Sequence, residues 1–113
     1  MTKLASYIFL YIAILVGILG QLLLKAGALE SQNIKQLFIQ PYVITGMFIY
    51  GSAAILYIIS LREIPISIAF PSVSLSYIVV AILGHYFWGE AFGIQQIIAT
   101  LLILVGVITL HGI

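Results

Sequence analysis

The chain has 113 residues, of which 64% are hydrophobic and only 6% are charged, and its formal net charge is +1. Soluble globular domains carry about a quarter of their residues as charged side chains, so the composition excludes that class and indicates a membrane protein. The sequence has no cysteine, no polybasic stretch and no Gly-x-x-x-x-Gly-Lys-Ser/Thr motif, which excludes disulfides, thiolate metal sites, a nucleic-acid-binding surface and a phosphate loop for ATP hydrolysis.

Four apolar segments predict four membrane helices. A bilayer core about 30 Å thick needs about 20 apolar residues per crossing, so four crossings use about 80 residues and leave about 33 for ends and loops. The first helix is expected over residues 4–24, between Lys3 and Lys25, and is too long to be the apolar core of a signal peptide. The polar stretch 26–40 is expected to be the longest loop, and Pro41 suits the first turn of a second helix over residues 41–61.

Short links join the remaining helices. Arg62 and Glu63 end the second apolar segment, and Pro65 opens a third helix expected over residues 65–88, so these two helices should form an antiparallel pair. Gly89 and Gly93, on either side of Glu90, interrupt the apolar sequence before a last helix, which is expected over residues 94–111. The sequence therefore predicts an all-α membrane protein with a single domain, residues 1–113, of four transmembrane helices with short loops. Four helices are too few to enclose a polar passage, which favours a dimer or larger oligomer.

Small and polar residues mark particular helix faces. In the first helix Gly17, Gln21 and Lys25 follow one another at intervals of four residues, with Gly20 beside them, so they share one thin polar face. In the third helix Pro71 lacks the amide hydrogen that would bond the carbonyl four residues earlier, which predicts a kink.

The third and fourth predicted helices carry two further groups of residues. Ser74 and Tyr77 gather on the same side of the third helix as the proline. In the last helix Ala99 and Gly106 lie one heptad apart. Small residues repeated on one side let helices approach closely in lipid, so this pair predicts a packing seam for a second helix.

The cationic side chains leave the orientation in the membrane open. With four crossings, Lys3 and Arg62 lie on one side of the membrane, and Lys25 and Lys35 lie on the other. The positive-inside rule therefore gives a tie, which permits insertion in both directions. Two copies inserted in opposite directions would form an antiparallel dimer, equivalent to the inverted repeat of larger transporters.

Several short motifs in order along the chain resemble the small multidrug resistance transporters, four-helix proteins of this length that work as dimers. The motifs are Ala13-Ile14-Leu15, Leu24-Lys25, the segment 64–70 and Val105-Gly106-Val107. In those drug exporters a glutamate in the first helix binds protons and cationic drugs in turn, and the matching position here is Gly17. Val73 likewise stands where they carry a tryptophan.

A closer resemblance is to the subunits of the aminoarabinose-phosphoundecaprenol flippase, a branch of the same superfamily. It is carried by Gly20-Gln21 with Lys25, by the run Ile-Pro-Ile-Ser-Ile-Ala-Phe-Pro over residues 64–71, by Ser74-Leu75, and by Trp88 with Glu90. The resemblance implies a transporter, with no enzymatic activity, cofactor or nucleic-acid partner. Such a protein would flip a polyprenyl-phosphate-linked sugar across the bacterial inner membrane by alternating access, for modification of lipopolysaccharide or another cell-envelope glycan. It would act as a homodimer or as a heterodimer with a related four-helix subunit.

The expected substrate-binding residues are Lys25, Gln21, Ser74 and Tyr77. Lys25 would bind the phosphate, with the alternative that it only reaches lipid headgroups from the helix boundary. Gln21 would bind sugar or phosphate oxygens, or else would bond a neighbouring helix. Ser74 and Tyr77 would offer hydroxyls and a ring face to the sugar, or would only pack between helices.

Other residues are expected in gating, structural and packing roles. Gating or structural roles are expected for Gly17, Gly20, Pro71, Arg62 and Glu90, and dimer packing for Ala99 and Gly106. Interfacial solvation or a loop salt bridge is the alternative for Arg62 and Glu90. No metal site is expected, because His85 and His111 lie far apart with no carboxylate at ligand spacing.

Two other functions stay open at this point. Export of small hydrophobic cations or polar metabolites would use the aromatic residues, which make up 12% of the chain, but no charge partner for a cation is visible within the apolar segments. A non-transport subunit of a membrane glycosylation complex would use the small-residue seam for assembly.

Overall fold

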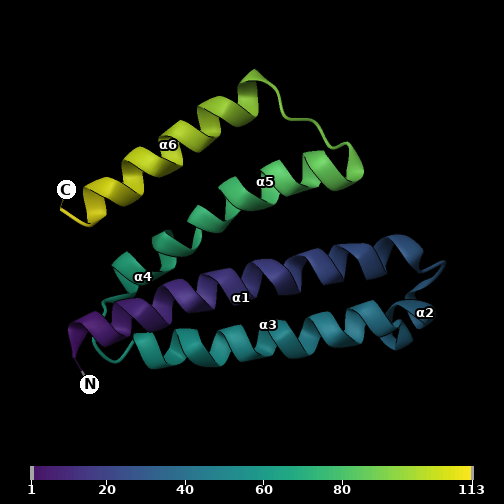
Figure 1. Ribbon diagram of the computed structural model, residues 1–113, viewed down its shortest axis with the longest axis horizontal. Coiled ribbons are helices and arrows are strands. Elements are labelled where there is room, and N and C mark those ends of the chain that lie inside the picture. Colours follow the sequence, from purple (N-terminus) through teal and green to yellow (C-terminus); the bar gives the residue numbers. More distant parts are fainter. Residues whose placement is uncertain (1, 113) are drawn as a thin grey trace.

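The computed structural model describes residues 2–112, which form an all-helical protein (Figure 1). In chain order the helices are α1 (Lys3–Glu30), α2 (Ile34–Ile39), α3 (Pro41–Ser60), α4 (Ile66–Val73), α5 (Leu75–Trp88) and α6 (Ile94–Leu110). The path through α1, the path through α3 and the 23-residue path through α4 and α5 are each long and apolar enough to cross a membrane. The 17 residues of α6 extend about 26 Å, at the lower end of the range for a crossing. The predicted all-α, multi-pass membrane class is confirmed.

The first connection differs from the predicted one. The expected helix over residues 4–24 continues to Glu30, and much of the expected loop 26–40 is helical because α2 lies within it. The hydroxyl of Ser31 donates to the carbonyl of Gly27 at 2.8 Å, and the Asn33 side chain accepts from the amide of Gln36 to begin α2. The prediction of a long loop was wrong because a polar stretch marks a change of surroundings and does not by itself end a helix.

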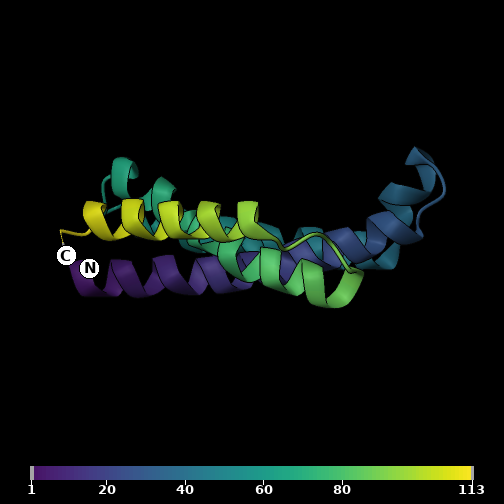
Figure 2. The ribbon, with the colours of Figure 1, turned by 90° about the horizontal axis from the view of Figure 1, so that it is seen from above.

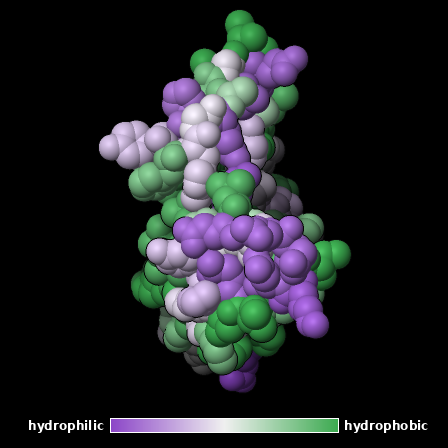
Figure 3. Space-filling model, turned by 90° about the vertical axis from the view of Figure 1, so that its right-hand side faces the viewer, coloured by the Kyte–Doolittle hydropathy of each residue, from purple (hydrophilic) through white to green (hydrophobic). Residues whose placement is uncertain are grey.

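Charged and amide side chains gather at the end of the molecule that holds α2. The exposed polar residues there are Gln32, Asn33, Lys35 and Gln36. Figure 3 views this end and shows hydrophilic side chains across it, with hydrophobic side chains at its margins. The polar end and the apolar flanks are what a protein needs at a membrane surface, where backbone and side-chain polar groups meet water again.

Helices α1 and α3 form a closely packed antiparallel pair, the two lower ribbons of Figure 1. A Cβ placed on Gly20 would lie 3.0 Å from the backbone nitrogen of Tyr50, and one on Gly46 would lie 3.1 Å from the carbonyl oxygen of Gly20. A Cβ on Gly27 would lie 2.8 Å from the backbone nitrogen of Val43. Glycine at these positions lets the two backbones approach, which is the usual basis of tight helix packing in lipid.

The third predicted helix is interrupted one turn after its proline. Helix α4 ends at Val73 and α5 begins at Leu75, so the kink expected from Pro71 is present as a break at Ser74. The amide of Ser74 donates to the carbonyl of Pro71 at 2.9 Å, a tighter turn than that of an α-helix, and the Ser74 hydroxyl donates to the same carbonyl. In Figures 1 and 2 the break changes the chain direction between α4 and α5.

The C-terminal end of α6 is attached to the N-terminal half of α1. The Tyr11 hydroxyl and Nε2 of His111 are 2.9 Å apart, and Nδ1 of His111 is 2.9 Å from the carbonyl oxygen of Val107. A carbonyl only accepts, so Nδ1 carries a hydrogen, and in a neutral ring Nε2 accepts from Tyr11. The start of α1 and the end of α6 therefore lie at the same end of the molecule, opposite α2 (Figures 1 and 2).

Candidate functional site

A groove of about 210 Å³ lies between α1, α3 and the α4–α5 path. Its lining comes mostly from small and aromatic side chains and includes Ala13, Ile14, Gly17, Gln21, Tyr50, Ala53, Ala54, Tyr57, Phe70, Val73 and Ser76. The small residues make the space, since a Cβ on Gly17 would already be in van der Waals contact with the Cβ of Ala53, 3.8 Å away. The volume is below the range of about 300–1,000 Å³ typical of drug-sized ligands, so the groove suits a small head group.

The groove is neutral and sparingly polar. Its polar groups are the Gln21 amide, the Ser76 hydroxyl and the Tyr50 and Tyr57 side chains, and no acidic or basic side chain is part of the lining described above. The Tyr57 ring lines the groove, whereas its hydroxyl is buried and has no hydrogen-bond partner within residues 2–112. The three acidic residues of the chain, Glu30, Glu63 and Glu90, all lie at helix ends or in connections.

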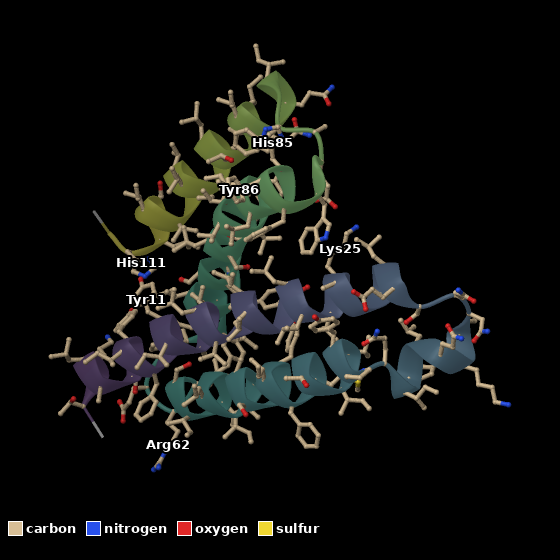
Figure 4. All side chains as sticks on the ribbon, turned by 45° about the vertical axis from the view of Figure 1, so that its right-hand side comes forward. Tyr11, Lys25, Arg62, His85, Tyr86 and His111 are labelled. Atoms are coloured by element: carbon tan, nitrogen blue, oxygen red, sulfur yellow. The ribbon has the colours of Figure 1, made fainter. Side chains whose placement is uncertain are left out.

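Lys25 lies one helical turn beyond Gln21, on the same face of α1, and forms an ion pair. Its Nζ is 3.0 Å from Oε2 of Glu90, which belongs to the connection between α5 and α6. The two side chains are 42% and 48% exposed, so water reaches both members of the pair. In Figure 4 Lys25 extends from α1 towards the end of α5. The contact therefore joins α1 to the α5–α6 connection at the end of the polar face.

The end of α5 positions the carboxylate of Glu90. Gly89 adopts a left-handed conformation with φ of 66°, and the amide of Glu90 then donates to the carbonyl of Gly84 at 3.3 Å. His85 donates from Nδ1 to the carbonyl of Glu90 at 2.8 Å. Oε1 of Glu90 occupies the space that a Cβ on Gly84 would take. The glycine at residue 84 thus leaves room for the carboxylate beside the helix.

The structure brings together some of the residues predicted from the sequence. Gly17 and Gln21 line the groove, and Lys25 lies on the same face one turn further. Lys25 also forms an ion pair with Glu90, for which a loop salt bridge was one of the predicted alternatives. Gly20 lies in the contact between α1 and α3 rather than in the groove.

Other predicted residues lie apart from the groove. Ser74 is half-buried with its hydroxyl bonded to the carbonyl of Pro71 at the helix break, and Tyr77 is 37% exposed; neither is part of the groove lining. Arg62 is exposed in the short connection after α3 and points away from the helices (Figure 4). Gly106 is exposed, and a Cβ there would have no atom within 4 Å, while Ala99 is half-buried.

Of the eleven lining residues, the sequence predicted only Gly17 and Gln21 as site residues. The missed residues include three with polar groups, Tyr50, Tyr57 and Ser76. Two of them carried a usable signal. Tyr50, Ala53, Ala54 and Tyr57 are spaced by three, four and seven residues, the spacing of one helix face. Small residues between two aromatic residues on one face indicate a recess with aromatic walls. Ser76 carried no such signal, because its direction depends on the break at Ser74.

Three long apolar helices and a shorter fourth one define a class, the multi-pass membrane proteins. The chain belongs to the EamA-like transporter family, whose model matches residues 1–111. It is a membrane transporter.

Individual relatives agree with this assignment. The chain is 28% identical over 107 residues to a probable 4-amino-4-deoxy-L-arabinose-phosphoundecaprenol flippase subunit, ArnE, of an Enterobacter species, covering 95% of this chain and 97% of the relative. A protein of the same name from Pectobacterium atrosepticum is 25% identical, with 95% and 98% covered. An uncharacterised protein, y4nH, of Sinorhizobium fredii is 32% identical, with 91% and 92% covered. No solved structure matches the chain. The resemblance to the flippase subunits drawn from short motifs is confirmed.

Proposed function

We propose that this transporter flips an anionic lipid, a sugar joined through phosphate to a polyprenyl chain, across the bacterial inner membrane. The observation that carries the proposal is the neutral groove along α1, with Gln21 in its lining and the cation of Lys25 one turn beyond. The polar head would pass along the groove while the polyprenyl tail stays in the lipid. The names of the Enterobacter and Pectobacterium relatives support the same class of cargo.

The charges of the groove favour an anion over a cation. A carboxylate inside the groove would repel a phosphate and is what a cation exporter needs, because an isolated charge in a low-dielectric site requires an opposite charge. None of the lining side chains is acidic, and the nearest cationic group in sequence on the same helix face is Lys25. The ammonium group of Lys25 would hold the phosphate by charge-assisted hydrogen bonds, and Gln21 would bind neighbouring oxygens.

Transport in this proposal breaks and forms no covalent bond. The groove would open alternately to the two surfaces by movement of α5 and α6 relative to α1 and α3, with the break at Ser74 as the hinge. Since no carboxylate lies in the groove to exchange protons, net flow would follow consumption of the lipid on the receiving side.

The test is translocation in sealed liposomes that contain the purified protein and radiolabelled 4-amino-4-deoxy-L-arabinose-phosphoundecaprenol. We expect transfer between leaflets well above that of protein-free liposomes, at the same rate with and without a pH gradient. Efflux of ethidium from cells that express the chain tests the alternative function, which is export of hydrophobic cations. Ethidium resistance without lipid transfer would overturn the proposal, and a strict need for a pH gradient would contradict the mechanism.

Assembly as a dimer, with itself or with a related four-helix subunit, belongs to the same proposal. The exposed surface of α6 around Gly106, with Ala99 one heptad earlier, is the proposed contact, because a small residue there leaves room for a second helix.

Gly106→Leu should weaken this dimer by filling the space that the partner helix needs. We expect a shift from dimer to monomer in detergent, measured by light scattering during size-exclusion chromatography, with the helical circular dichroism spectrum unchanged. Gly51→Leu is the matched control, since Gly51 is also open but lies on α3. A Gly106→Leu protein that remains dimeric would place the interface elsewhere.

A further inference from the structure

We propose that the Glu90 carboxylate occupies the phosphate site of Lys25 when no cargo is bound, and that the cargo's phosphate displaces it. This inference rests on the proposed function. It assigns Glu90 the part of an internal competitor, a group of this chain that must leave before a phosphate can bind. The exchange of one anion for another would also detach the α5–α6 connection from α1.

The geometry of the pair supports an exchange. Oε2 of Glu90 lies 3.0 Å from Nζ of Lys25, the distance at which a phosphate oxygen would bind the same ammonium group. A carboxylate and a phosphate present the same kind of anionic oxygen, so only one of them can take this position on Lys25. Because Glu90 is 48% exposed, its carboxylate can turn into water when displaced.

The local structure keeps Glu90 in this position. The left-handed Gly89 and the bond from His85 to the Glu90 carbonyl fix the backbone, and Gly84 leaves the space that the carboxylate fills. A loop carboxylate that only needed solvation would require no such space beside the helix. Lys25 belongs to α1 and Glu90 to the α5–α6 connection, so binding of phosphate to Lys25 would break a contact between these two parts of the chain.

The exchange predicts opposite effects for the two members of the pair. Glu90→Gln removes the competitor and should tighten binding of undecaprenyl phosphate by about twofold to fivefold, the size expected for a solvent-exposed ion pair. Lys25→Gln removes the site and should weaken the same binding by about tenfold or more. A pair with only a structural role predicts that both substitutions lower stability and that neither changes binding.

Gly84→Ala provides a second test that keeps every charge. The added methyl group would meet the Glu90 carboxylate, the far end of a flexible side chain, and would move it away from Lys25. We expect tighter binding, in the same direction as for Glu90→Gln. Glu63→Gln is the control, because it removes an equal charge at the opposite end of the molecule and should leave binding unchanged.

Binding is measured by the fluorescence of Trp88, the one tryptophan of the chain, which lies two residues from Glu90. This fluorescence is followed in nanodiscs of phosphatidylcholine during titration with undecaprenyl phosphate, inorganic phosphate or undecaprenol. Binding of both phosphates but not of undecaprenol would identify phosphate as the competing group, and binding of the lipid alone would identify the lipid-linked form. If Glu90→Gln and Lys25→Gln change the affinity for undecaprenyl phosphate equally or in the same direction, the exchange is overturned and the proposed function is left intact. Failure of the wild type and of Glu90→Gln to bind either phosphate would overturn both.

Discussion

Lys25→Ala should reduce translocation of the labelled sugar lipid by at least about tenfold. A hydrogen bond to a charged group contributes about 1.5–3 kcal/mol, and about 1.4 kcal/mol corresponds to a factor of ten. The substitution removes the cation one turn from Gln21, and it also leaves Glu90 as an uncompensated negative charge on the path of the phosphate. The measurement is the initial rate of transfer between leaflets in liposomes with equal amounts of reconstituted protein.

Lys35→Ala is the matched control for this experiment. Lys35 has the same charge and lies at the same end of the molecule, on the short helix α2 away from the groove lining. Its removal should change the rate by less than about twofold if position rather than overall charge matters. Lys25→Arg should retain part of the activity because it keeps a cation. Equal rates for Lys25→Ala and the wild type would return Lys25 to the role of a boundary lysine among lipid headgroups.

Gly27→Ala should destabilise the protein by about 1–3 kcal/mol, the usual effect of an added methyl group in a packed contact. The new Cβ would lie 2.8 Å from the backbone nitrogen of Val43 and 2.5 Å from Cγ2 of the same residue. A side chain can rotate away, but the backbone of α3 can only move as part of the helix. The closely packed pair of α1 and α3 would therefore have to separate. The measurement is the midpoint of thermal unfolding in detergent.

Gly51→Ala separates this steric effect from the general effect of replacing glycine in a helix. A Cβ on Gly51 in α3 would have no atom within 4 Å in the described chain, and alanine is favoured over glycine in a helix by about 1 kcal/mol. We expect its unfolding midpoint to equal or exceed that of the wild type. A Gly27→Ala protein as stable as Gly51→Ala would mean that α1 and α3 are not held together at Val43.

The amino-acid sequence predicts the helices better than their ends. The apolar runs correctly indicated helices, three of which are long and apolar enough to cross a membrane, and Pro71 correctly indicated an interruption in the third. The length of α1 was underestimated because hydropathy reports contact with lipid, whereas the helix continues through residues 26–30, where all residues except Gly27 have high helix propensity. The position of the break, at Ser74, depends on how the turn after the proline closes and could not be read from composition.

For the candidate site, contacts within one helix were predictable and contacts between helices were not. Gly17, Gln21 and Lys25 share a face because of helix geometry alone, and two of them line the groove. The meeting of Lys25 with Glu90 depends on the path of α5 beside α1, which sequence spacing does not contain. The break at Ser74 decides which side chains of the α4–α5 path turn towards α1, so the sequence could not place Ser74 and Tyr77 relative to the groove.

The attachment of His111 to Tyr11 has a consequence for mapping the protein in a living cell. Because Thr2 and His111 lie at the same end of the molecule, a reporter fused before the first helix and one fused after the last would sense the same compartment (Figure 2). A population inserted in one direction gives matching readings from both fusions. A population inserted in both directions gives mixed readings in the same proportion at each terminus, so the ratio measured at one end serves as an internal check on the other.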